Sequence, residues 1–223
     1  LKEIKKVFGN IPNKPKSPKL PVKERQTMPK ILLKKKKTDQ SHLILGFRSY
    51  DIFYPGNPAL ALLSVVLGAG MSSRLFQRLR EELGVCYYVR SGNDAYTDHG
   101  YFEIAAGLAN DRLAEVIPAV LNECKKLKDE LVPHDELEKA KEYIIGNTKL
   151  NLESSDAIAM FYGSQEILKH KVNIPEEKFK KIRAVSAVDL RNLARKIFKQ
   201  ETLNLAMIGP SNDKKKLEKL LKI

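Results

Sequence analysis

The sequence has few cysteines, no long apolar run and no secretory signal. Its two cysteines, Cys86 and Cys124, lie far apart among 223 residues, which favours a reducing compartment. No apolar stretch reaches the roughly 18–20 residues that a bilayer-spanning helix needs. No basic segment followed by an apolar one opens the chain. We therefore expect no membrane span, and a cytoplasmic location is preferred.

The sequence also lacks the short motifs that mark common active sites. Its four histidines are His42, His99, His134 and His170. None has a second histidine at helical spacing, so H-E-x-x-H and H-x-x-E-H are both missing. There is no G-x-S-x-G, no Walker loop, and no G-x-G-x-x-G after a strand. By its own residues the chain carries no complete catalytic constellation and no metal site.

One sign of charge is in excess. The chain has 40 basic and 27 acidic residues, for a net charge of +13, a balance that suggests nucleic acid or an anionic surface. However, lysine dominates, and no aromatic residue interleaves with the runs Lys34–Lys37 and Lys214–Lys216 as a stacking platform would require. Solubilising, edge-protecting lysine is the better account, and we expect no specific nucleic-acid partner.

The first part of the chain resembles a linker. Gly9–Pro21 is rich in proline and lysine and does not continue a helix, whereas Leu1–Phe8 looks like the end of one. We therefore interpret residues 1–21 as the tail of a preceding domain followed by a linker. Residues 22–223 are long enough for a single large domain.

Beyond the linker, the hydrophobic pattern predicts strands first, helices next and one strand near the end. The expected strands are Lys30–Lys36 and Ser41–Arg48, paired as an antiparallel hairpin, then Val85–Asn93, Tyr101–Leu108 and Leu203–Ile208. The expected helices include Ala59–Leu67, Ser72–Leu83, Ile158–Lys169, Pro175–Ile182, Ala187–Phe198 and Ser211–Lys222. This order predicts an α+β fold: an antiparallel sheet with helices packed on one face, closed by the C-terminal strand.

The segment "LGAGMSSRLFQRLREELGVCYYVRSG", residues 67–92, is unusually rich in arginine. At about 100° per residue, one apolar stripe of the expected helix consists of Leu75, Leu79 and Leu83, with Phe76. Arg74 and Arg78 fall on the opposite side, which predicts that both are exposed to solvent. Arg80 lies at the margin of the stripe, where a guanidinium can pack its stem on the core and offer its donors outward.

Two tyrosines follow this helix in the next strand. Tyr87 and Tyr88 should point to opposite faces of the sheet, so one of them can return near Arg80. Periodicity leaves two interpretations open: a marginal arginine beside an ordinary cross-strand aromatic, or an arginine and a tyrosine that face something together.

The segment "GAGMSSRLFQRLREELGVCYYV" resembles G-G-x-x-S-x-L-[FY]-x-x-[IL]-R-E-x-x-G-x-x-Y-x-V of insulinase/pitrilysin-type zinc metallopeptidases, the group that includes mitochondrial processing peptidase. The likeness covers essentially the whole chain and is to the C-terminal half of such a subunit. "FGNIPNKPKSPKLP", "ELEKAKEYIIGN…LNLESS" and "IRAVSAVDLRNLARKIFKQETLNLAMIGP" resemble further segments of the same half, in the same order.

The resemblance implies a division of labour between two halves. In that family the first half supplies the zinc motif, which is missing here, so no zinc ligand is carried over. The second half supplies an arginine and a tyrosine that grip the peptide backbone near the scissile bond, and these match Arg80 and Tyr87. Cys86 stands where a small residue is common. The resemblance thus implies zinc in the parent enzyme, and a peptide substrate and the N-terminal half or a homologous subunit as partners.

Two functions follow from this resemblance. The first is the substrate-binding C-terminal domain of a zinc-dependent endopeptidase, with the isolated chain inactive. The second is half of a non-catalytic partner subunit that binds and presents peptides. Such partners often lose the Arg/Tyr pair, so the presence of Arg80 and Tyr87 favours the first.

Overall fold

The computed structural model describes residues 1–12, 14, 15, 17, 19–211 and 213–223. The strands are β1 (Lys30–Lys35), β2 (Gln40–Ser49), β3 (Cys86–Ala95), β4 (Gly100–Ala109) and β5 (Asn204–Gly209). The helices are α1 (Lys2–Phe8), α2 (Asn57–Gly68), the π-helix η1 (Phe76–Glu82), α3 (Leu113–Asp129), α4 (His134–Asn151), α5 (Ser155–Lys169), α6 (Pro175–Arg183), α7 (Ala187–Ile197), the 3-10 turn η2 (Gln200–Thr202) and α8 (Lys214–Leu220).

The five strands form one sheet in the order β1-β5-β2-β4-β3. The predicted hairpin between Lys30–Lys36 and Ser41–Arg48 is wrong, because β5 lies between these two strands. β1 pairs with β5 in parallel, while the other three pairings are antiparallel. A strand from the end of the chain thus separates two neighbours in sequence, an arrangement that no local turn signal reveals.

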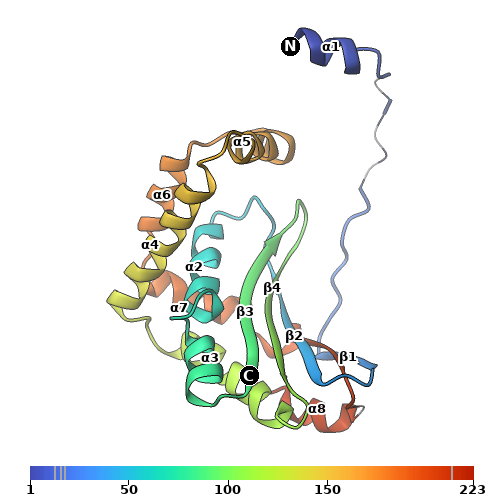
Figure 1. Cartoon of the computed structure of the whole chain (residues 1–223), viewed down its shortest axis with the longest axis vertical. Coiled ribbons are helices and arrows are strands. Elements are labelled where there is room, and N and C mark those ends of the chain that lie inside the picture. The colour runs from blue at the N-terminus through green and yellow to red at the C-terminus, as the bar shows by residue number, and fades with distance from the viewer. Residues whose placement is uncertain (13, 16, 18, 212) are drawn as a thin grey trace.

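Helices that include α2, α3 and α7 cover one face of the sheet, as the α+β prediction expects, whereas α1 lies away from it (Figure 1). Each central strand alternates, so every second side chain enters the core between sheet and helices. On β2 these side chains are Leu43, Leu45 and Phe47, each no more than 1% exposed. Phe47 and Phe102 of β4 both meet Phe198, which follows α7, in edge-to-face contacts with ring centroids 5.1 and 5.4 Å apart.

The opposite face, which we call the open face, carries smaller and more polar side chains. Its positions on the two central strands are His42, Ile44, Gly46 and Arg48 on β2, and Tyr101, Glu103, Ala105 and Gly107 on β4. Ile44 is 41% exposed, whereas its neighbour Leu45 is fully buried. The predicted alternation of β4 between an apolar and a more polar face is therefore correct.

The described residues before β1 include a helix and a stretch that contacts the sheet. α1 has no buried residue, and Figure 1 shows it away from the sheet. Lys19 bonds to Thr97 and Asp98 at the β3–β4 turn, and Glu24 pairs with Arg48 at 2.8 Å. These contacts tie residues 19–24 to one end of the open face. The division at residue 21 itself remains a prediction.

Parts of two predicted segments are not described. Asn13, Lys16 and Pro18 of the expected linker, and Asn212 of the expected terminal helix, lie outside the described residues. The terminal helix itself is present as α8, from Lys214 to Leu220. Of the helices that the structure describes, none is both long enough and apolar enough to cross a membrane.

Candidate functional site

β3 begins with a β-bulge that sets the direction of its two tyrosines. Cys86 pairs with Leu108 and Tyr88 pairs with Gly107, so Tyr87 is an extra residue without its own partner on β4. Both tyrosines are consequently exposed, Tyr87 at 56% and Tyr88 at 39%. The expectation that they point to opposite faces is wrong, because the bulge breaks the alternation.

The helix before β3 is wider than an α-helix. The predicted range Ser72–Leu83 contains η1, a π-helix from Phe76 to Glu82, in which the N–H of Leu83 bonds to the carbonyl of Arg78 at 3.2 Å. Short π-helical turns occur frequently at functional sites. A repeat of 3.6 residues therefore does not describe side-chain directions accurately here, although Leu75 and Leu79 are fully buried as predicted.

Arg80 lies against the first residues of β3. Its Nη1 donates to the backbone carbonyl of Tyr87 at 2.9 Å, and its guanidinium carbon lies 5.3 Å from the centre of the Phe76 ring. Burial raises the pKa of the Cys86 thiol, and the positive charge of Arg80 opposes this shift. Arg80 and Tyr87 are thus adjacent and both exposed. A guanidinium has five N–H donors, so Arg80 has donors left for a ligand.

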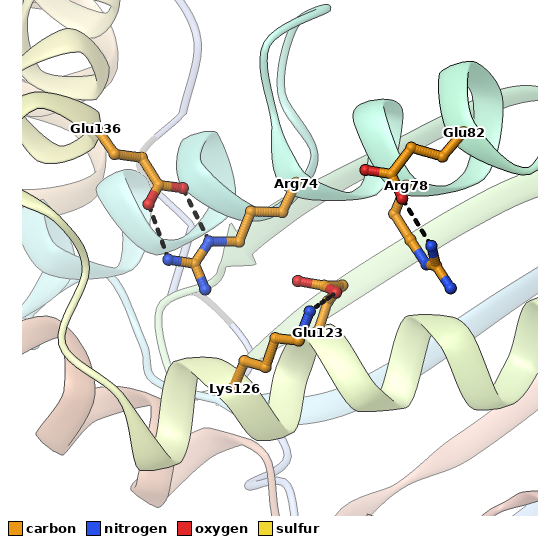
Figure 2. A network of polar contacts seen from close by, with 6 residues as sticks. All are labelled: Arg74, Arg78, Glu82, Glu123, Lys126 and Glu136. Carbon is orange, nitrogen blue, oxygen red and sulfur yellow. Dashed lines mark hydrogen bonds and ion pairs between the residues drawn. The ribbon is translucent and has the colours of Figure 1, made fainter.

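Arg74 does not lie where the helical angles placed it. Its side chain is 16% exposed rather than solvent-facing, and its Nε and Nη2 donate to Oε1 and Oε2 of Glu136, both at 2.8 Å. Arg78 is exposed as predicted and pairs with Glu82 of its own helix at 2.6 Å. Figure 2 shows Arg74 pointing from the start of η1 toward Glu136 of α4, above Glu123 and Lys126 of α3.

A second aromatic contact lies on the open face beside Tyr87. The Tyr88 hydroxyl lies 3.2 Å from Nδ1 of His42, and the two rings are nearly parallel, with centroids 5.9 Å apart. The Tyr88 ring covers Gly107, where an added Cβ would overlap it. Tyr88 therefore lies across β4 toward β2, while Tyr87 stays free of this contact and close to Arg80.

Arg80 and Tyr87 lie on the exposed surface of the domain. A cavity of about 540 Å³ lies between the turn before α2 and the helices α6 and α7, and residues such as Tyr54, Lys181 and Lys196 line it. Neither Arg80 nor Tyr87 contributes to that lining.

A known family matches the first part of the chain. Residues 1–144, which include η1, Arg80 and all of β3, match the family described as "Peptidase M16 inactive domain".

The chain belongs to the peptidase M16 inactive-domain family.

Two curated relatives support the assignment. An uncharacterized zinc protease, YmxG of Bacillus subtilis (strain 168), is 34% identical over 213 residues, covering 96% of this chain and 51% of the relative. An uncharacterized zinc protease of Rickettsia bellii (strain RML369-C) is 36% identical over 183 residues, covering 79% of this chain and 43% of the relative. This M16 inactive domain thus spans about half the length of the curated relatives it matches.

Solved structures support the fold. A peptidase M16 inactive domain from Pseudomonas fluorescens superposes with a TM-score of 0.82 at 19% identity, covering 92% of this chain and 49% of that one. A protease from Helicobacter pylori superposes with a TM-score of 0.80 at 22% identity, covering 92% of this chain and 50% of that one. At such low identity these likenesses concern the fold alone.

The relatives' names imply zinc, which we tested against the side chains of this M16 inactive domain. Within the part of the chain that the structure describes, no three His, Cys, Asp or Glu residues lie together in a way that would hold a metal ion. His99, for example, bonds to Asp98 at 2.7 Å in the β3–β4 turn and stacks on Tyr96. The donor set of this domain does not fit a zinc centre.

The sequence predicted that one of the two tyrosines lies near Arg80, and the Tyr87 backbone does, but it missed two nearby contacts. The Arg74–Glu136 pair joins residues 62 positions apart, and His42 and Tyr88 are 46 apart. The acidic first turn of α4 and the tyrosine pair were visible in the sequence, yet neither indicated its partner. Contacts over such separations depend on how the sheet and helices assemble.

Proposed function

We propose that this domain is the substrate-binding, C-terminal half of a zinc-dependent endopeptidase. In this proposal Arg80 and Tyr87 hold the peptide backbone, while the zinc site belongs to another half. The observation that carries the proposal is the bond from Arg80 to the backbone carbonyl of Tyr87, because it brings an exposed guanidinium to the residue that bears an exposed phenol. The names of the relatives support the reaction class.

The two side chains suit the recognition of a peptide carbonyl. A guanidinium fork and a phenol both donate hydrogen bonds, and donors that are already in place stabilise negative charge as it develops on a carbonyl oxygen. The bond to the Tyr87 carbonyl fixes the direction of Arg80 before substrate arrives, which reduces the ordering that binding requires. Both side chains are exposed, which supports a role beside a second half that would complete a substrate-binding cleft.

Kinetics of the protein joined to its other half test the pair directly. Arg80→Ala and Tyr87→Phe should each lower kcat/KM for a peptide substrate, by about a hundredfold for the arginine, as when one oxyanion donor is lost. Arg78→Ala and Tyr88→Phe are the matched controls, because they remove the same groups from neighbouring positions. Wild-type kinetics in both Arg80→Ala and Tyr87→Phe would reject the assigned role.

The division between two halves has its own test. The purified 223-residue chain should cleave no peptide, because the metal ligands and general base are assigned to the other half. Metal-dependent peptidase activity in this chain, with contaminating proteases excluded, would refute the proposal.

The encoding gene tests which kind of subunit the domain belongs to. Codons upstream of Leu1 should encode H-x-x-E-H, the inverted zinc motif. An upstream half without that motif would instead favour a non-catalytic subunit that binds and presents peptides.

A further inference from the structure

Arg74 and Glu136 form a bidentate ion pair that restricts the positions of both side chains. Two parallel N–H···O bonds of 2.8 Å join the guanidinium to the carboxylate, and the two side chains are 16% and 26% exposed. Bidentate pairs of this kind add geometric specificity to their strength. The pair connects the residue just before η1 with the first turn of α4.

The surroundings of Arg74 favour its contact with Glu136. The hydrogen bond to Glu136 raises the pKa of Arg74, burial opposes the rise, and the charges of Glu123 and Glu130 add to it. Glu136 lies in the first turn of α4, where the helix dipole favours a negative charge. Figure 2 shows Glu123 of α3 below the Arg74–Glu136 pair, so Arg74 lies near carboxylates of two helices, Glu136 of α4 and Glu123 of α3.

The apolar side of the helix and the ion pair restrict its orientation in different ways. Leu75 and Leu79 are fully buried and keep one side of the helix in the core, but hydrophobic contact is non-directional and defines the rotation less sharply than hydrogen bonds do. A two-bond fork at one end restricts that rotation further. At the other end, the N–H of Val85 bonds to the carbonyl of Leu79 at 2.9 Å. The segment that presents Arg80 is therefore held at both ends.

We infer that Arg74 and Glu136 are positioning residues for Arg80. Their ion pair sets the rotation of η1, and that rotation places the Arg80 guanidinium on the Tyr87 carbonyl. The inference rests on the proposed function of Arg80 and adds two residues to it, neither of which contacts the substrate.

A kinetic cycle in the protein joined to its other half tests this role. Arg74→Ala should lower kcat/KM by about tenfold or more, because a small misplacement of a positioning group is costly. Arg74→Lys keeps the charge but loses the fork, so it should also lower kcat/KM. Exchanging the charges of residues 74 and 136 is not a useful test, because a carboxylate at position 74 would be repelled by Glu123 and Glu130.

The decisive comparison is made in an Arg80→Ala background. If Arg74 acts through Arg80, then Arg74→Ala should add little to the loss that Arg80→Ala already causes. An equal further loss in that background would mean general damage and would overturn the inference. Unchanged kcat/KM in both Arg74 variants, with kcat/KM lowered in Arg80→Ala, would also overturn the inference. Arg78→Ala is the control, since it removes an exposed arginine from the same helix, and it should stay within about twofold of wild type.

Hydrogen exchange separates this inference from the proposed function. In the 223-residue chain, Arg74→Lys and Glu136→Gln should speed amide exchange at Leu83 and Val85, whose N–H groups bond within this segment, while Arg78→Ala should not. Unchanged exchange in both variants would overturn the support role, whatever the kinetics show. If Arg80→Ala has no kinetic effect yet exchange does increase, the proposed function fails and the structural support stands.

Discussion

Leu45 and Ile44 are neighbours on β2, and they belong to two very different surfaces. Leu45 is fully buried beneath the helices, whereas Ile44 is 41% exposed on the open face. The covered face is held by close apolar packing, including the contacts of Phe47 and Phe102 with Phe198. The open face is held by single contacts, such as Tyr88 with His42 and Arg48 with Glu24.

This difference shows how one sheet serves stability and binding at the same time. Large side chains on the covered face exclude water and contribute most of the free energy of folding. The open face has small residues at Gly46, Ala105 and Gly107 on its two central strands, so larger groups such as Tyr88 can lie flat across it. The groups proposed for binding border this second surface, where substitution costs less stability.

The largest expected effect tests the covered face. Leu45→Ala should lower the free energy of unfolding by about 3 kcal/mol, because it leaves a cavity in a packed core. Ile44→Ala on the same strand should cost less than about 1 kcal/mol, since Ile44 remains partly in water. Urea unfolding followed by circular dichroism measures both values. Similar losses in the two variants would break the comparison between the faces.

A smaller loss of stability is expected at a tight contact on the open face, between Gly107 and the Tyr88 ring. Gly107→Ala places a Cβ where the Tyr88 ring lies, and overpacking of this kind costs about 1–2 kcal/mol. The ring is forced off its position, so the contact with His42 should be lost as well.

The partner substitution makes this prediction specific. In a Tyr88→Ala background the added methyl group has room, so Gly107→Ala should then be nearly neutral, and a double-mutant cycle of unfolding free energies measures the coupling. Additive losses would mean that the ring does not occupy the space above Gly107 in solution.

The smallest loss of stability is expected when a helix cap on the covered side is removed, rather than a buried side chain. Ser186 and Asp189 form a capping box at the start of α7, so Ser186→Ala should lower the free energy of unfolding by about 1 kcal/mol. That loss is well below the loss from Leu45→Ala, although α7 packs on the same core. Thermal unfolding at neutral pH is the measurement, and a loss equal to that of Leu45→Ala would contradict this ranking.

The same cap predicts a pH dependence. Hydrogen bonds from the Ser186 hydroxyl and backbone N–H hold the pKa of Asp189 below its usual value. A carboxyl group with a lowered pKa in the folded state binds fewer protons there, so its contribution is complete above a pH of about 4. The contribution is lost as the pH falls through the folded-state value. Asp189→Asn should therefore flatten the acid side of the stability curve, and an unchanged acid limb would exclude the cap as its source.

Much of the fold could be predicted because its signals are local. Alternation in Tyr101–Leu108 and the apolar residues of Ala59–Leu67 depend on periods of two and 3.6 residues, which neighbouring side chains establish. The approach of Arg80 to Tyr87 also spans only seven positions. The order of strands and helices follows from the same short-range patterns, whereas the family resemblance depends on motif residues such as those of segment 68–89. The family is confirmed by the comparisons.

Four features were decided only by the tertiary structure. β5 enters between β1 and β2, η1 widens to a π-helix, a bulge turns Tyr87 and Tyr88 outward together, and Arg74 meets Glu136 rather than solvent. Each depends on a surface supplied by a distant part of the chain. The sequence alone thus determined which residues form the elements and which face of each is apolar, because those properties depend on neighbours. The assembled core decided how the elements pair and where the arginines point. A buried charge is costly unless it is paired, so the direction of an arginine such as Arg74 depends on which carboxylate the fold places nearby.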